Sequence, residues 1–280
     1  MKSVRELIRR ATPRSVRNWL RQPTRSFRYL ADRARYARQG PTDVQVRDGW
    51  RVRCHPASVD HFRIFIADPA QATELDTFIR YCRPGIQFLD VGAHYGLFSL
   101  AALHFGGSDA HVVAVEASAN ASKILTANLA ANGASNRVDV VNAAMGATNG
   151  TLQMLSTGPA GSDYFVSAPA DRTDTIPVRQ LSMPGVLRQT RLIPTHVKMD
   201  IEGFEDEAIS GALESLREHR PVLFLELHVR FLRTRGRDPA AILERLCQCG
   251  YVRFEENGIT LSIAELAARE MDCRIVCMPE

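Results

Sequence analysis

Two glycines follow an acidic residue in the stretch Phe88 to Leu100, which reads FLDVGAHYGLFSL. An apolar run ends in Asp90, Gly92 and Gly96 stand four apart, and the chain then becomes apolar again. In an open α/β sheet, ligands bind beyond the carboxyl ends of the strands, and the turn after the first strand must let a ligand approach bare backbone. We therefore predict a cofactor-binding turn here, with Gly92 and Gly96 supplying the room.

Asp90 and Glu116 indicate the kind of cofactor. A carboxylate before the first glycine repels a phosphate, and Val-Gly-Ala-His lacks the second glycine of the dinucleotide fingerprint, which disfavours NAD. Asp90 instead suits a ligand that carries an ammonium group. Glu116 ends the next strand 20 residues after Gly96, where an acid accepts the ribose hydroxyls of an adenosine cofactor. Together they predict S-adenosylmethionine (SAM), although either acid alone is also typical of a solvated strand end or a helix N-cap.

A second set of reactive side chains lies in the stretches MDIEG and LELH, at the ends of two further strands: Asp200, Glu202, Glu226 and His228. His228 is the natural general base for a hydroxyl substrate, because the unperturbed pKa of a histidine lies near 6.5. Glu226 alternates with it along the strand and therefore points to the same face. The structural alternative for His228 is a strand-end histidine bound to a backbone carbonyl.

The same carboxylates raise the question of a metal ion. Three of them beside an imidazole can bind Mg²⁺ or Mn²⁺, which prefer oxygen ligands. Their mutual repulsion can equally be relieved by Lys198 or by raised pKa values. The sequence leaves the metal open. Asn142, just past the third strand, stands where this architecture usually reaches the adenine, or it is a turn residue that ends the strand.

These residues need an alternating α/β scaffold to bring them together. Near-continuous apolar runs predict strands at Gln87 to Val91, His111 to Val115, Arg137 to Val141, Thr195 to Met199 and Val222 to Leu227, with closing strands near Tyr251 to Glu255 and Cys273 to Met278. Helical periodicity predicts helices at Gln71 to Cys82, from Leu97, at Asn120 to Ala131, Glu205 to Arg217 and Pro239 to Cys249. The loosely patterned segment Gly146 to Pro194 indicates an antiparallel excursion. The whole predicts a doubly wound, mostly parallel sheet.

The basic charge is concentrated at the N-terminus. Residues 1–40 contain 12 Lys or Arg and 2 acids, a charge of +10, whereas the remaining 240 residues carry −6. Apolar residues recur there at helical spacing, so we predict a basic amphipathic helical extension over 1–45, followed by one domain over 46–280. It can lie on an anionic membrane surface, bind nucleic acid or pack on the domain. No run is long enough for a membrane span or signal peptide, and the six cysteines form no C-x-x-C pair. We expect a cytoplasmic protein, with peripheral attachment to the inner membrane face as one outcome.

Four motifs in order resemble the FkbM-type family of SAM-dependent methyltransferases: FLDVGAHYGLFSL, VEASANASKILTANLAANG, HVKMDIEGFE and LFLELH. The resemblance spans about Val52 to Tyr251. It implies a Rossmann-like class I methyltransferase sheet of seven strands, a cofactor site that includes His94, and methylation of a hydroxyl on a sugar, glycolipid or secondary metabolite. His94 stands where the family usually has Asn, and Ala117 where it usually has Pro. Both substitutions leave Glu116 and the glycine turn in place, so we expect them to be tolerated. Ser182 stands where an acid is usual, so a catalytic role for an acid there is in doubt.

Two other classes of protein remain as alternatives. A nucleic-acid methyltransferase would use the basic extension, but the body is acidic and the fourth strand ends in DIEG rather than in the Pro-Pro-aromatic motif of base-flipping enzymes. A non-catalytic SAM-fold adaptor would keep the cofactor turn and lose the acids near Asp200, which are present. The sequence does not identify the methyl acceptor or the oligomeric state.

Overall fold

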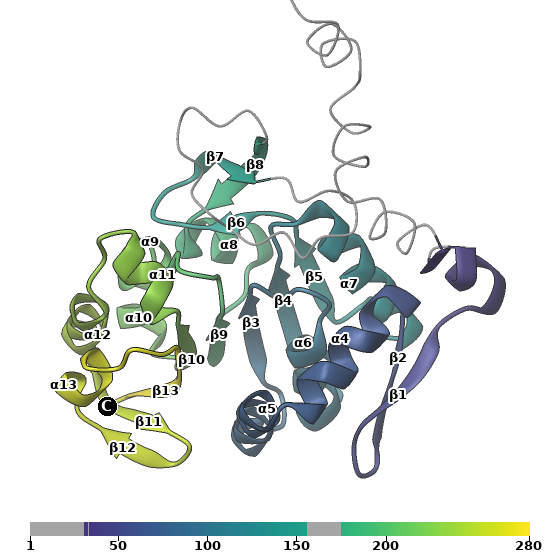
Figure 1. Cartoon of the computed structure of the whole chain (residues 1–280), viewed down its shortest axis with the longest axis horizontal. Coiled ribbons are helices and arrows are strands. Elements are labelled where there is room, and N and C mark those ends of the chain that lie inside the picture. Colours follow the sequence, from purple (N-terminus) through teal and green to yellow (C-terminus); the bar gives the residue numbers. More distant parts are fainter. Residues whose placement is uncertain (1–30, 33, 156–174) are drawn as a thin grey trace, which may run out of the picture.

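An eight-stranded sheet forms the centre of the computed structural model, which describes residues 31–32, 34–155 and 175–280 (Figure 1). The strand order is β12-β11-β13-β10-β9-β3-β4-β5. Five strands are parallel: β3 (Gln87–Val91), β4 (His111–Val115), β5 (Val138–Val141), β9 (His196–Met199) and β10 (Val222–Leu227). The chain runs outward from β3 to β5 and then returns to the other side of β3. The order therefore reverses between β3 and β9, where open α/β sheets bind their ligands.

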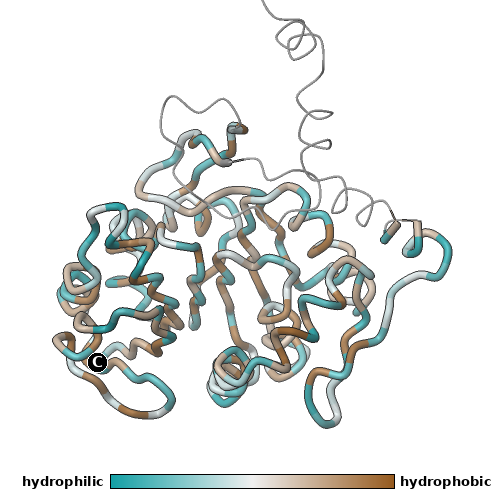
Figure 2. The backbone as a smooth tube through the Cα atoms, viewed as in Figure 1, coloured by the Kyte–Doolittle hydropathy of each residue, from teal (hydrophilic) through white to brown (hydrophobic). Residues whose placement is uncertain are grey.

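Helices cover both faces of this sheet, as the doubly wound prediction requires. Neighbouring residues on β3 point to opposite sides, so Phe88 joins one apolar core and Leu89 the other. The Phe88 side is covered by α4 (Pro56–Ala67), α5 (Pro69–Tyr81), α6 (Leu97–Phe105) and α7 (Ala119–Ala131). The Leu89 side is covered by α8 (Met183–Thr190), α9 (Glu205–Ser210), α10 (Leu213–His219), α11 (Val229–Thr234), α12 (Pro239–Gln248) and α13 (Ile263–Ala267). Figure 2 shows the apolar strands between these layers.

The C-terminal edge of the sheet is antiparallel. β13 (Cys273–Pro279) lies between β10 and β11 (Tyr251–Glu256), and β12 (Ile259–Leu261) pairs with β11 as an eighth strand beyond the predicted seven. A two-residue turn joins β11 to β12. Its residues Asn257 and Gly258 both have positive φ, at +53° and +79°, which is typical of an Asn-Gly hairpin. That dipeptide was the sequence signal for the extra strand.

The segment between β5 and β9 contains the predicted antiparallel pair. β7 (Gly150–Leu155) runs antiparallel to β8 (Thr175–Leu181), and β6 (Ala144–Met145) adds a parallel third strand. Ser182 caps the N-terminus of α8, its Oγ accepting a hydrogen bond from Gly185 N at 3.3 Å. Ser182, at the position where the resemblance leads us to expect an acid, therefore serves as a helix N-cap.

One predicted helix is broken in the structure. The run Glu205 to Arg217 forms α9 and α10, separated at Gly211 and Ala212. A Cβ added at Gly211 would lie 2.4 Å from the carbonyl oxygen of Gly146. The missing Cβ at Gly211 thus lets the backbone at this break pack directly against the loop after β6.

A hairpin precedes the helices of the Phe88 side. β1 (Thr42–Arg47) and β2 (Trp50–Cys54) pair antiparallel, and the boundary expected at residue 45 falls within β1. Residues 1–30, which carry most of the predicted amphipathic extension, lie outside the described residues. In the part of the chain that is described, no helix is long and apolar enough to cross a membrane.

Candidate active site

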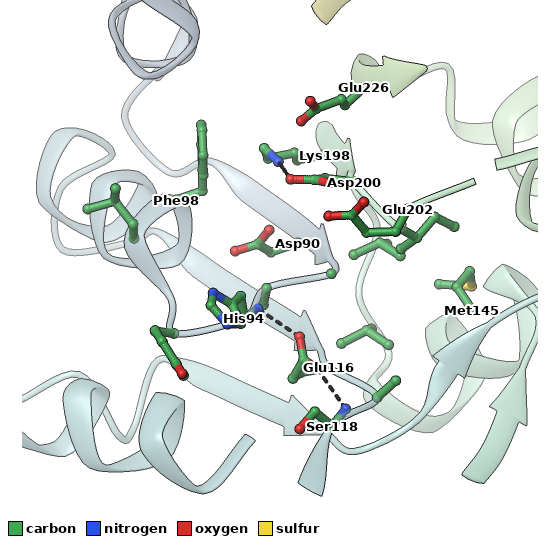
Figure 3. Close-up of a pocket in the computed structure, with 18 of the residues that line it drawn as sticks. Asp90, His94, Phe98, Glu116, Ser118, Met145, Lys198, Asp200, Glu202 and Glu226 are labelled. Atoms are coloured by element: carbon green, nitrogen blue, oxygen red, sulfur yellow. Dashed lines mark hydrogen bonds and ion pairs between the residues drawn. The ribbon is translucent and has the colours of Figure 1, made fainter. Parts of the chain in front are cut away.

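A cavity opens at the carboxyl ends of β3, β4, β9 and β10 (Figure 3). Among the predicted site residues, Asp90, Gly92, His94 and Glu116 line it on one side and Asp200, Glu202, Glu226 and His228 on the other. Side chains of α4 and α5 form a further wall that the sequence did not predict, including His61, Phe65 and Gln71. The two predicted sets of residues therefore belong to one site.

The glycine turn is required by the protein's own packing. Gly92 has φ +82°, and a Cβ there would lie 1.9 Å from the carbonyl oxygen of Asp200. Gly96 has φ +89°, and its Cβ would lie 2.4 Å from Leu125 Cδ1. The missing Cβ atoms are therefore required by contacts within the protein. Gly92 also lines the cavity, whereas Gly96 is not among the residues that line it, and room for a ligand at these glycines stays a prediction.

Glu116 is held by backbone N–H groups at the end of β4. Its Oε2 accepts a hydrogen bond from His94 N at 2.8 Å and its Oε1 accepts one from Ser118 N at 2.7 Å (Figure 3). The N-cap of α7 is Ser118, whose own side chain accepts from Ala121 N. Glu116 is therefore not the cap, and its oriented carboxylate lines the cavity.

Asp90 is almost fully buried at the end of β3, with 1% of its surface exposed. Ser99 Oγ donates a hydrogen bond to its Oδ2 at 2.6 Å. Burial raises the pKa of Asp90 to about 6, although Lys198 and Ser99 oppose this shift. A bound cation would lower that pKa again and stabilise the carboxylate.

Asn142 does not contribute to the cavity wall. Its Nδ2 donates hydrogen bonds to the carbonyl oxygens of Glu116 at 2.7 Å and Ala117 at 3.1 Å. The cavity is lined instead by the next residues, Ala143 and Ala144. The predicted adenine contact is thus not supported, because the amide ties the end of β5 to the end of β4.

His228 is the centre of the second set of residues. Its Nδ1 lies 2.8 Å from Glu205 Oε1. Its Nε2 lies 3.4 Å from Glu202, 3.8 Å from Asp200 and 3.9 Å from Glu226. The partner of His228 is thus the carboxylate of Glu205 rather than a backbone carbonyl. This contact orients the ring toward the three further acids.

Glu205 is the main residue of this cluster to which sequence reasoning gave no role. It is fully buried at the start of α9 and also accepts a hydrogen bond from Gly203 N at 3.0 Å. Burial by itself lowers the pKa of His228, but the hydrogen bond and charge of Glu205, with Asp200 and Glu226, outweigh it and raise the pKa to about 9. This ring is therefore a stronger base than an unperturbed imidazole.

Two cations neutralise part of the acidic cluster. Lys198 Nζ lies 3.0 Å from Asp200 and 3.4 Å from Glu74, and Arg274 lies 2.5 Å from Glu226 and 3.1 Å from Glu74. Burial raises the pKa of Glu226 to about 8, with repulsion from Asp200 and Glu74 adding to it. Both expected means of relieving the repulsion therefore operate, namely Lys198 and a raised carboxyl pKa.

The geometry also permits a divalent cation. Ligand atoms of Asp200, Glu226 and His228 lie within 4.8 Å of one another. However, Lys198 and Arg274 already contact two of these three side chains. The cluster thus has its own positive charges, and a metal ion would compete with them.

The chain was compared with known proteins. The model of the methyltransferase FkbM domain matches residues 90–253. The chain belongs to this family. The match includes the glycine turn, Glu116 and the acidic cluster up to His228, and it confirms the resemblance seen in the four sequence motifs. A search of curated protein sequences gives no match.

Some solved structures are similar to this chain, at low identity and low TM-score. The FkbM methyltransferase of Methylobacillus flagellatus KT is 15% identical, with a TM-score of 0.44, over 79% of this chain and 53% of that one. A Rossmann-superfamily protein of Streptococcus agalactiae is 13% identical, with a TM-score of 0.44, over 74% and 67%. The precorrin-6y C5,15-methyltransferase of Geobacter metallireducens GS-15 is 15% identical, with a TM-score of 0.39, over 75% and 87%.

The pairing of His228 with Glu205 can be tested without any substrate. In an NMR titration of the histidine rings, we expect His228 to titrate with a pKa of about 9. Glu205→Gln keeps an acceptor for Nδ1–H and removes the charge, so the pKa should fall by about one unit or more. The titration of His104 on α6 should not change. An equal pKa for His228 in both proteins would contradict the assigned partner.

Proposed function

We propose that the protein is a SAM-dependent methyltransferase that methylates a hydroxyl oxygen of a sugar, glycolipid or secondary metabolite. The family match supports methyl transfer. The observation that supports this cofactor and reaction is that one cavity contains both sets of residues. Glu116, oriented by backbone N–H groups, lines it together with His228, which is paired with the buried carboxylate of Glu205.

The charge of the cavity fits a cationic cofactor. Asp90, Glu116, Asp200 and Glu202 line it, whereas the lysine and arginine that line it are each paired with an acid. Glu226 and His228, whose pKa values are raised to about 8 and about 9, each carry a proton at pH 7. A pyrophosphate would be repelled here, but the ammonium and sulfonium groups of SAM would be attracted. Glu116 would accept the ribose hydroxyls, and Asp90 lies at the turn where the amino group would bind.

His228 is the proposed general base. When bound, SAM supplies an activated methyl group. The acceptor hydroxyl must lose its proton as it attacks, and His228 Nε2 is the atom that takes it. Glu205 holds Nδ1–H and stabilises the imidazolium that forms, because its carboxylate is buried and 2.8 Å away.

Protonation of His228 limits this chemistry at neutral pH. A raised pKa means that the ring carries a proton below about pH 9 in the free enzyme. A positive charge bound in the cavity lowers this pKa by repulsion. Cofactor binding would thereby convert His228 into the unprotonated base that the reaction needs.

Cofactor binding is tested by calorimetry. Glu116→Ala should weaken SAM binding about tenfold to a hundredfold, because hydrogen bonds from the ribose hydroxyls to a carboxylate are lost. Asn142→Ala is the control, since that side chain lies outside the cavity wall, and should bind SAM as the wild type does. NADH should not compete. Unchanged SAM affinity in Glu116→Ala would refute the assignment.

The base is tested with labelled SAM and acceptor fractions of the source cells, separated into lipid, polysaccharide, small-molecule and nucleic-acid pools. His228→Ala should lower kcat by about 10² or more while SAM affinity stays near wild type. Since the base must be unprotonated, kcat/KM for SAM, which reports the free enzyme, should rise with pH toward about 9, and Glu205→Gln should move this inflection to lower pH. Loss of SAM binding in His228→Ala would give it a structural role.

Two outcomes of the same assay separate the alternatives. Activity that is lost with a chelator and restored by Mg²⁺ would show that the acidic cluster binds a metal. Label that enters nucleic acid alone would favour the nucleic-acid methyltransferase, and SAM binding without label in any pool would favour the adaptor.

We also propose that the basic extension attaches the protein to the cytoplasmic membrane face. Residues 1–40 carry +10, and each basic residue near an anionic bilayer contributes about 1 kcal/mol, a gain that salt screens. Deleting residues 1–40 should abolish co-sedimentation with anionic vesicles and leave SAM affinity unchanged. If the full-length protein does not co-sediment with such vesicles at low salt, this proposal is refuted.

A further inference from the structure

Two histidines meet on the cavity wall beside the glycine turn. His61 comes from α4 and His94 follows Gly92, and His61 Nε2 lies 3.2 Å from His94 Nδ1. The two rings meet edge to face with centroids 4.4 Å apart, and the His94 ring stacks on Tyr95. Both histidines line the cavity. His61 lies before the family match, which begins at residue 90.

The other ring nitrogen of His94 has no hydrogen-bond partner among the residues that the structure describes. This Nε2 is buried, and leaving such a group unpaired costs about 1–3 kcal/mol. Burial lowers the pKa of His61 to about 4 and that of His94 to about 3. Both rings are therefore neutral at pH 7, and each has one N–H donor and one acceptor. Because one ring donates its N–H to the other at the 3.2 Å contact, the pair presents a single further N–H donor, at His61 Nδ1 or at His94 Nε2.

The hydrogen bonds of α7 hold α4 against this turn. Asn128, which is fully buried, accepts from His55 N at 2.6 Å at the N-terminus of α4 and donates to the carbonyl of Tyr95 at 2.8 Å. One turn later, Asn132 exchanges two hydrogen bonds with the backbone of Arg53. The position of His61 is thus set by the same helix that supports the turn.

The position of the pair suggests its ligand. In the view of Figure 3, Asp90 lies between His94 and the Lys198–Asp200 pair. With Glu116 assigned to the ribose and Asp90 to the ammonium group, the carboxylate of the amino-acid part of SAM still needs hydrogen-bond donors. Lys198 and Arg274 are engaged with acids. Asp200, which acts electrostatically on both histidines, is itself 3.0 Å from Lys198, which reduces its repulsion of an anion.

We propose that the His61–His94 pair, positioned by Asn128, binds the carboxylate of the amino-acid part of SAM. This inference rests on the proposed function. It makes α4, which precedes the family match, part of the cofactor site, and it assigns to His61 a binding role in addition to its packing.

The test compares ligands that differ in this one group. Calorimetry with the full-length protein measures SAM, decarboxylated SAM, which keeps the ammonium and sulfonium groups, and 5′-methylthioadenosine, which lacks the amino-acid part. His61→Ala should weaken SAM binding about tenfold or more, because hydrogen bonding to a charged group is lost. Affinity for decarboxylated SAM and 5′-methylthioadenosine should change by less than about twofold.

Control variants separate binding from packing. His61→Phe keeps a ring without a donor and should show the same selective loss as His61→Ala. His111→Ala removes a histidine at the start of β4, the end of the strand opposite to the cavity, and should leave the ratio of SAM to decarboxylated SAM affinity unchanged. Circular dichroism and thermal melts establish that each variant is folded.

The outcomes distinguish this inference from the proposed function. If His61→Ala weakens all three ligands equally, or leaves SAM affinity unchanged, the pair does not bind the carboxylate and this inference is refuted. If the wild type binds none of the ligands, the proposed function itself fails.

Discussion

The contact between Gly92 and Asp200 is the constraint on which the rest of the site depends. Asp200 N donates a hydrogen bond to Val91 O at 3.1 Å, and the carbonyl oxygen of Asp200 occupies the space of the missing Cβ at Gly92. Parallel pairing of β3 with β9 thus brings the cofactor turn and the first acid of the cluster into direct contact. Any side chain at 92 would force the two strand ends apart and separate the proposed cofactor from the proposed base.

Electrostatic balance is the second constraint. Carboxylates outnumber cations in and around the cavity, and Lys198 and Arg274 share Glu74 as a common partner. The pKa values of Glu226, raised to about 8, and of His228, raised to about 9, indicate that protons on these two groups offset part of the negative charge at pH 7. A cavity that retains protons in this way favours a cationic ligand, because the ligand can replace them. In the proposed function, cofactor binding and the protonation of His228 are therefore linked.

The sequence predicted the parallel strands and their end residues well, since both depend on local patterns. The limits of β3, β4 and β10 match the predicted ones, and the acids that follow them line one cavity. Contacts between distant segments were harder to predict. Glu205 looked like an ordinary acid at a helix start, and its role appears only when α9 meets the end of β10. For Asn142 the sequence left an adenine contact and a strand-ending role open, because no local pattern reveals that its amide turns back to the carbonyls of Glu116 and Ala117.

The family-matched span does not complete the site by itself. Glu74 lies before residue 90 and Arg274 after residue 253, yet these two side chains bond each other and respectively reach Lys198 and Glu226 inside the span. Without Glu74, buried Lys198 would keep one of its two carboxylate partners, and without Arg274, Glu226 would lose its guanidinium partner. Removing one partner of a buried ion pair leaves a charge that burial makes costly. α5 and β13 are therefore part of the candidate site, because Glu74 and Arg274 balance the charges of the acidic cluster.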